Sequence, residues 1–160
     1  MLKMLPAVVV ACGLCGSAKA ADDAEYVKLV LADSGKVLAV ADNSEDAGAK
    51  IVVAKDESSE AQQWKLEKDG DYYKIVNRKT GKVLDVEMES KDEGASIIQW
   101  DDKAENNENQ RWSWQGNGKS RQLKSKSSDL VLDVDDNGMV IQRKADENAK
   151  LQLWKVVEVK

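Results

Sequence analysis

Four polar and aromatic residues in the middle of the chain have side chains that suit one kind of ligand. Asp85, Trp100, Asn109 and Gln110 lie within 26 residues of one another. A carboxylate is a strong hydrogen-bond acceptor, an amide both donates and accepts, and an indole offers a flat apolar wall. A sugar ring presents neighbouring hydroxyl groups and one apolar C–H face, so it requires all three kinds of contact. These residues are therefore candidate binding residues for a saccharide.

The same residues also have a purely structural interpretation. Asp85 could cap a turn, and Trp100 could fill a gap between two hairpins. The positions that correspond to Trp100 elsewhere in the chain hold Ala54 and Arg143. A core position in a symmetric fold should not require a tryptophan once and an alanine elsewhere. This difference favours binding, while the structural interpretation stays open.

A threefold internal repeat predicts how the candidate residues are positioned. A Gly-Lys-Val-Leu turn begins at Gly35 and again at Gly81, 46 residues later. A Gln-x-Trp triplet occurs three times, with its tryptophans 48 and 42 residues apart, at Gln62/Trp64, Gln110/Trp112 and Gln152/Trp154. Two independent markers therefore agree on the period, which places the repeats at about 26–70, 71–118 and 119–160.

Each repeat is expected to form four short strands. Apolar runs of four to six residues are separated by polar turn residues every 8–12 positions, and no window keeps helical spacing for three turns. One repeat cannot bury its apolar face alone, so the three copies must pack around a common axis. We therefore predict an all-β fold in a single domain, residues 21–160, with strands near 26–31, 37–41, 51–55, 64–67, 72–77, 83–86, 97–101, 112–115, 122–126, 130–134, 140–144 and 154–159.

The three triplets, each after a Val-Leu-like turn, make the chain resemble the ricin B-type β-trefoil lectins over about residues 26–160. The resemblance implies a β-trefoil, in which twelve strands form a six-stranded barrel capped by hairpins with pseudo-threefold symmetry. It implies sugar-binding roles for Asp85, Trp100 and Asn109, with Gln110 reinforcing the aspartate. Ile98 is a departure, because many members have a polar residue there. The triplet residues would be structural, in the core of the repeats: Gln62, Trp64, Trp112, Gln152 and Trp154.

Only the middle repeat keeps the complete set of candidate residues, so we expect one sugar site. A single shallow site exchanges hydrogen bonds to water for hydrogen bonds to protein, so its Kd should be roughly 0.1–10 mM. The resemblance suggests a galactose-type sugar. At the corresponding positions the first repeat has Ala39, Ala54 and Ala61, and the third has Asp133, Arg143 and Leu151.

The first twenty residues are typical of a secretory signal peptide. Lys3 precedes an uncharged and mostly apolar run over residues 5–16, and residues 18–20 have a small-x-small cleavage pattern. We therefore expect a secreted protein, either extracellular or periplasmic. Residues 9–12 resemble a bacterial lipobox, so lipidation at Cys12 and tethering to a membrane is the alternative.

Composition argues against several function classes. The formal charge is −5 and becomes −7 when Lys3 and Lys19 leave with the signal peptide, which disfavours nucleic acids and anionic membranes as partners. The chain has no histidine and its two cysteines lie in the first twenty residues, so the mature chain lacks the usual catalytic nucleophile pairs and transition-metal ligands. Residues 133–138 match half of an EF-hand loop, but Lys144 replaces the required glutamate, which favours a turn. We expect no enzyme activity, metal or cofactor.

Two functions are compatible with these features. The first is a secreted carbohydrate-binding module with one sugar site, for which a saccharide or glycan is the partner. The second is a degenerate trefoil that keeps the scaffold and binds a protein, as an inhibitor or an adhesion surface. The loss of candidate residues from two of the three repeats motivates this alternative.

Overall fold

The computed structural model describes residues 26–160. The expected signal peptide and Cys12 lie outside this range. The described residues form twelve strands and five single turns of 3-10 helix, and none of these helices is long and apolar enough to cross a bilayer. The strands are β1 (Val27–Leu31), β2 (Val37–Val40), β3 (Ile51–Ala54), β4 (Trp64–Asp69), β5 (Tyr72–Asn77), β6 (Val83–Val86), β7 (Ile97–Trp100), β8 (Trp112–Gln115), β9 (Gln122–Ser125), β10 (Val131–Val134), β11 (Val140–Arg143) and β12 (Trp154–Glu158).

The prediction of an all-β chain with twelve strands is confirmed, and most strand ends lie within one residue of the expected positions. The largest difference is β4, which continues to Asp69. The reason is the tight β4–β5 hairpin, in which Asp69 still pairs with Tyr72 across the turn. Polar residues such as Lys68 can extend β4 here because one face of this strand is open to solvent.

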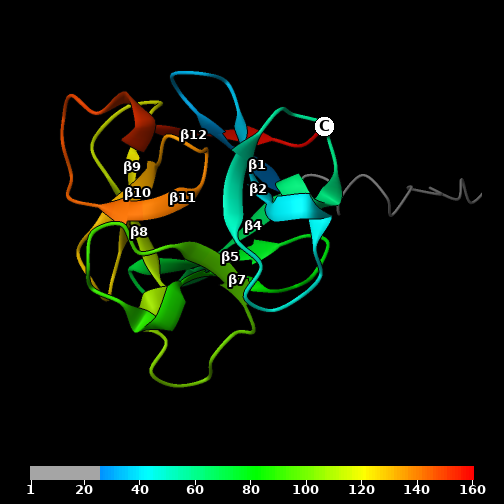
Figure 1. Ribbon diagram of the computed structural model, residues 1–160, viewed down its shortest axis with the longest axis vertical. Helices are drawn as coiled ribbons and strands as arrows, with labels where there is room; N and C mark the ends of the chain where they lie inside the picture. Colours follow the sequence, from blue (N-terminus) through cyan, green and yellow to red (C-terminus); the bar gives the residue numbers. More distant parts are fainter. Residues whose placement is uncertain (1–25) are drawn as a thin grey trace, which may run out of the picture.

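The three repeats adopt the same arrangement of strands. In each repeat the second and third strands form an antiparallel hairpin with four paired positions: β2–β3, β6–β7 and β10–β11. Figure 1 shows the repeats as three lobes, coloured from blue to cyan, green, and yellow to red. The first and last strands, β1 and β12, pair along five residues and join the two ends of the described chain.

The twelve strands form one connected sheet with branches at β1 and β5, in which β9 and β12 do not pair as a ladder. These two strands are joined by an isolated bridge between Arg121 and Trp154, with N–O distances of 3.0 and 2.9 Å, instead of by a ladder. The strand pairing among residues 26–160 therefore does not describe a closed sheet. The six-stranded barrel implied by the family resemblance stays a prediction.

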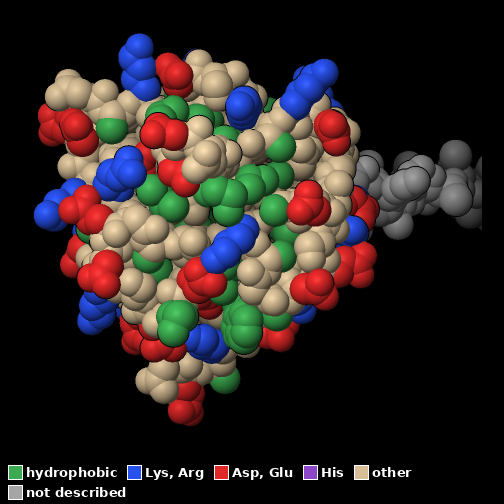
Figure 2. Space-filling model, viewed as in Figure 1, with side chains coloured by type: hydrophobic (Ala, Val, Ile, Leu, Met, Phe, Trp, Pro, Cys, Tyr) green, Lys and Arg blue, Asp and Glu red, His purple; other side chains and the backbone are tan. Residues whose placement is uncertain are grey.

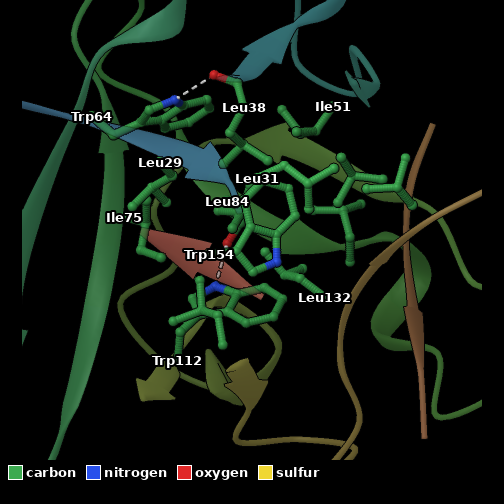
Figure 3. Close-up of a cluster of buried hydrophobic side chains, with 14 of the residues drawn as sticks. Leu29, Leu31, Leu38, Ile51, Trp64, Ile75, Leu84, Trp112, Leu132 and Trp154 are labelled. Carbon is green, nitrogen blue, oxygen red and sulfur yellow. Dashed lines mark hydrogen bonds between the residues drawn. The ribbon is translucent and has the colours of Figure 1, made fainter. Parts of the chain in front are cut away.

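The tryptophans of the three triplets lie in the core (Figure 3). Trp64 and Trp112 are fully buried, and Trp154 is 1% exposed. The indole N–H of Trp64 donates to the Leu38 carbonyl at 3.0 Å, and that of Trp112 donates to the Leu84 carbonyl at 3.1 Å. Each bond satisfies a polar group that burial would otherwise leave unpaired. The Trp154 indole N–H is the exception, because it has no hydrogen-bond partner among the described residues.

The glutamine of each triplet closes the loop that leads into it. Gln110 ends the 3-10 turn η4 (Glu108–Gln110); its amide donates to the Asp101 carbonyl at 2.9 Å and accepts from the Lys103 N–H at 2.9 Å. The two other triplet glutamines, in η2 (Glu60–Gln62) and η5 (Lys150–Gln152), make the same pair of backbone bonds, with Lys55 and Glu57 and with Lys144 and Asp146. This clamp is thus a property of the scaffold that all three repeats share.

Candidate functional site

Asp85 is a buried acid at the centre of the middle repeat. It lies in β6 opposite Ile98 of β7 and is 3% exposed. One carboxylate oxygen accepts from the side-chain amide of Asn109 at 2.9 Å, and the other accepts from the side-chain amide of Gln110 at 2.7 Å. The two amides hold the carboxylate in one orientation. A carboxylate has about four acceptor positions, so two remain for a ligand.

The surroundings of Asp85 also set its protonation. Burial raises the pKa of Asp85 to about 6, and the negative charge of Glu89 acts in the same direction. The hydrogen bond from Gln110, the positive charge of Lys103 and the hydrogen bond from Asn109 lower this pKa and only partly offset burial. The carboxylate is therefore mostly ionised at neutral pH and becomes protonated under mildly acidic conditions.

Trp100 lies at the surface, unlike the tryptophans of the triplets. It ends β7 and is 42% exposed. It pairs with Val83, as Ala54 pairs with Val37 in the first repeat and Arg143 with Val131 in the third. This register confirms that the three positions correspond.

A loop of the first repeat forms a wall beside the Trp100 ring. The Gly48 N–H donates to the Gln99 carbonyl at 2.8 Å, and the Gln99 side chain donates to the Asp46 carbonyl at 2.8 Å. A Cβ atom added to Gly48 would lie 3.5 Å from the indole, and Gly48 has a left-handed φ of 88°. Glycine therefore allows the backbone to run close to the aromatic ring.

Asp85, Trp100 and Asn109 line one pocket of about 500 Å³. Gln110 does not line it; it lies behind Asp85 and positions the carboxylate through its hydrogen bond. Ile98, where many members of the family have a polar residue, gives the pocket an apolar patch beside the Trp100 indole. The remaining lining residues are Gly48, Glu87, Met88, Glu89, Ile98 and Lys103.

Asn109 contributes less donor capacity than the family resemblance implies. Its amide nitrogen donates to Asp85 at 2.9 Å and to the Val86 carbonyl at 3.1 Å, so both N–H groups are used within the protein. Its amide oxygen accepts from the Lys103 ammonium at 3.3 Å, and that ammonium also pairs with Glu89 at 2.6 Å. An ammonium has three donors. Lys103 therefore supplies the donor available to a ligand at this corner of the pocket.

Five pocket residues did not emerge from the sequence: Gly48, Glu87, Met88, Glu89 and Lys103. Gly48 belongs to a different repeat, although the matching glycine at 94, whose N–H makes the corresponding bond to the Gln142 carbonyl, was a usable signal. Met88 is 92% exposed in the 3-10 turn η3 (Glu87–Glu89) and has a left-handed φ of 55°, which is unusual for a bulky residue. Lys103 carried no signal, because charged residues are frequent throughout the chain.

The corresponding place in the third repeat has a different character. The Asp133 carboxylate accepts from the Val134 N–H at 2.6 Å and from the Gln152 amide at 2.9 Å. The Arg143 guanidinium lies 3.5 Å from it and occupies the position of the indole. Leu151, 38% exposed, stands at the position of Asn109. The third repeat therefore offers an ion pair where the second offers a free carboxylate and a ring.

The half EF-hand motif forms a turn. The Asp135 carboxylate accepts from the backbone N–H groups of Asn137 and Met139, both at 2.9 Å, and the Gly138 N–H donates to the Asp135 carbonyl at 3.0 Å. Within residues 26–160, no three Asp, Glu, His or Cys side chains cluster in a way that could hold a metal ion.

Comparisons with known proteins relate both the sequence and the fold to one family. Residues 17–100 match the family described as ricin-type β-trefoil lectin domain-like. A designed threefold symmetric protein, ThreeFoil, is 33% identical, with a TM-score of 0.79 over 84% of this chain and 99% of that chain. No curated protein matches the sequence.

Two natural proteins have a similar structure. An exo-β-1,3-galactanase from Clostridium thermocellum is 38% identical, with a TM-score of 0.77 over 86% of this chain; the match spans 31% of that enzyme. A Polyporus squamosus lectin, solved with the epitope Neu5Aca2-6Galb1-4GlcNAc, is 19% identical, with a TM-score of 0.74 over 83% of this chain and 48% of the lectin. At that identity the lectin supports the fold alone.

Proposed function

We propose that this chain, which belongs to the ricin-type β-trefoil lectin domain-like family, is a carbohydrate-binding module with a single sugar site in its middle repeat. The observation that carries the proposal is the convergence of Asp85, Trp100 and Asn109 on one pocket. The three side chains come from β6, β7 and η4. Their positions in the other two repeats hold side chains that do not make this combination.

The pocket chemistry suggests how a sugar would bind. The apolar face of the ring would lie on the exposed indole of Trp100, where it removes apolar surface from water. A hydroxyl would donate to the ionised Asp85 carboxylate, and the Lys103 ammonium would donate to a neighbouring hydroxyl. Asn109 and Gln110 would keep the carboxylate in place. This arrangement binds hydroxyls on one edge of the ring and leaves the opposite edge in solvent.

A galactose-type sugar is the proposed ligand. The family resemblance supports it, and the 38% identical neighbour is an enzyme that acts on a β-1,3-galactan. We propose binding without catalysis, because Asp85 is held by two amides. The other two acids of the pocket, Glu87 and Glu89, are paired with Lys50 and Lys103. Export of the mature chain rests on the pattern of residues 1–20.

The charges of the described surface are consistent with a neutral ligand. Acidic and basic side chains are interspersed over the face seen in Figure 2. Most of the lysines and arginines near the site are paired, including Lys50 with Glu87 and Lys103 with Glu89. The face shown therefore has no broad basic patch of the kind that attracts a polyanion such as nucleic acid.

A glycan array followed by calorimetric titration tests the proposal. We expect galactose-type glycans to bind with a Kd of roughly 0.1–10 mM. Asp85→Ala should weaken binding by about 1.5–3 kcal/mol, the usual contribution of a hydrogen bond to a charged group, and so raise the Kd by about 10- to 150-fold. The fold should persist, because Ala39 occupies the same place in the first repeat.

Asp133→Ala in the third repeat is the matched control, and it should leave sugar binding unchanged. Retention of binding by Asp85→Ala would contradict the assignment of the site. The alternative function of a protein-binding trefoil would be supported if the wild-type chain bound no glycan but did bind a protein partner, and if Asp85→Ala still bound that partner.

A further inference from the structure

A second hollow adjoins the sugar pocket at the boundary between the second and third repeats. It has a volume of about 360 Å³. Glu89 and Asn109 line both this hollow and the sugar pocket, so the two spaces are neighbours. The far side is formed by Lys126 and Ser127, from the turn between β9 and β10. We call this space the 2/3 seam.

The equivalent boundary between the first and second repeats is bridged by side chains. The Lys79 ammonium donates to the Asn43 carbonyl at 2.7 Å and pairs with Glu45 at 3.3 Å. The Arg78 guanidinium donates to the Gln63 side chain at 2.8 Å. Two long cationic side chains of the second repeat thus reach across to the first and close this boundary.

Backbone hydrogen bonds establish which residues correspond at the two boundaries. The Arg78 N–H donates to the Gln63 carbonyl, and the Lys126 N–H donates to the Arg111 carbonyl, both at 2.9 Å. Lys126 is therefore the counterpart of Arg78. One residue further along the chain, Ser127 is the counterpart of Lys79.

The third and second repeats have different residues at these boundary positions, and these differences keep the 2/3 seam open. Ser127 is too short to make the crossing that Lys79 makes, and Lys91 stands where Glu45 would supply the opposite charge. The Lys126 ammonium lies over the Tyr72 ring of the second repeat, 5.1 Å from its centroid. Arg78 lies over the Tyr26 ring in the same way, 4.7 Å from its centroid, so this contact is common to both boundaries and the difference lies at Ser127 and Lys91. The open seam therefore results from side-chain differences on the same backbone.

We propose that the 2/3 seam is a second saccharide subsite, so that the ligand of this chain is a disaccharide or a longer oligosaccharide. This inference rests on the proposed function, since the first sugar unit would occupy the Asp85 pocket. The seam presents a hydroxyl, amides, carboxylates and ammonium groups and has no aromatic wall. It suits a second sugar unit that is bound through its hydroxyls, with donors from Lys91 and Ser127 and acceptors from Asn106 and Glu108.

Calorimetric titration of the full chain with galactose and with β-1,3-galactobiose tests the inference. We expect the disaccharide to bind about tenfold more tightly, which corresponds to about 1.4 kcal/mol. Ser127→Lys copies the residue that closes the other boundary. It should reduce the affinity for galactobiose to that for galactose, while the affinity for galactose itself stays unchanged.

Lys79→Ser is the matched control, because it removes the same crossing at the other boundary, and its contacts Asn43 and Glu45 do not line the Asp85 pocket. It should change neither affinity. If Ser127→Lys fails to fold, Lys91→Ala tests the same subsite. It should weaken the binding of galactobiose and leave the affinity for galactose unchanged. Equal affinities for the two sugars in the wild-type chain, or unchanged galactobiose binding in the folded seam variants, would overturn the subsite. If the wild-type chain bound no galactose at all, that result would instead count against the proposed function.

Discussion

The first and second repeats share a backbone and differ in what they present at the surface. Both have the glutamine clamp, at Gln62 and Gln110, and both bury the triplet tryptophan. At the three positions that form the sugar pocket, the second repeat has Asp85, Trp100 and Asn109, and the first has Ala39, Ala54 and Ala61.

The difference separates scaffold from function. The first repeat folds with three alanines, so the acid, the ring and the amide are not required to form the strands or the turn. Burying Asp85 is unfavourable for its charged form, as its raised pKa shows. The scaffold does not require this costly group, which supports the proposed role of Asp85 in binding a sugar.

The largest effects should come from the features that both repeats share. Trp64→Ala and Trp112→Ala should each lower the free energy of unfolding by about 3–5 kcal/mol, the usual cost of removing a buried aromatic side chain. Both indoles are fully buried and donate to a leucine carbonyl, so the two losses should be similar. Urea unfolding followed by circular dichroism would measure them. A loss below about 1 kcal/mol in one variant alone would show that the repeats are not equivalent scaffolds.

A smaller effect, confined to the second repeat, should follow from Trp100→Ala. This variant has the alanine that the first repeat has at the corresponding position, Ala54. If a sugar covers about 80 Å² of apolar surface, binding should weaken by about 2 kcal/mol at about 25 cal/mol per Å². Calorimetry is the suitable measurement, because the variant lacks the fluorophore nearest the ligand. The unfolding free energy should change little, since the indole is 42% exposed; a large loss of stability with unchanged binding would support the structural interpretation.

The smallest effect should be a dependence of sugar affinity on pH. The first repeat cannot produce it, because Ala39 stands at the position of Asp85. Asp85 has a pKa of about 6, and a hydroxyl donates best to the ionised carboxylate. Affinity should therefore fall about tenfold between pH 7 and pH 5. A flat affinity profile over this range would argue that the ligand does not contact Asp85.

Stability should change in the opposite sense over the same range. The pKa of Asp85 is higher in the folded chain than its ordinary value of 3.8, so this group's contribution to stability is present at low pH and is lost as the pH rises through about 6. Comparing unfolding in the wild type and in Asp85→Ala would isolate that contribution from those of the other carboxylates.

Much of the fold could be predicted because the signal was repeated three times. A single Gln-x-Trp triplet is weak evidence, but three at one period identify the repeats, and turn residues then bound the strands. Trp100 could be assigned to the surface because its counterparts are small or charged. The structure agrees on this point, with Trp100 exposed and Trp112 fully buried.

The sequence by itself determined the class of fold, the threefold repeat and the residues that distinguish the middle repeat. All of these depend on local patterns and on comparing one copy with another. The tertiary structure decided which side chains line the proposed site. Gly48 comes from another repeat, Lys103 takes the donor role beside Asn109, and the 2/3 seam is open because Ser127 is short. Contacts between repeats depend on the lengths and directions of side chains brought together by packing, and no pattern within one copy encodes them.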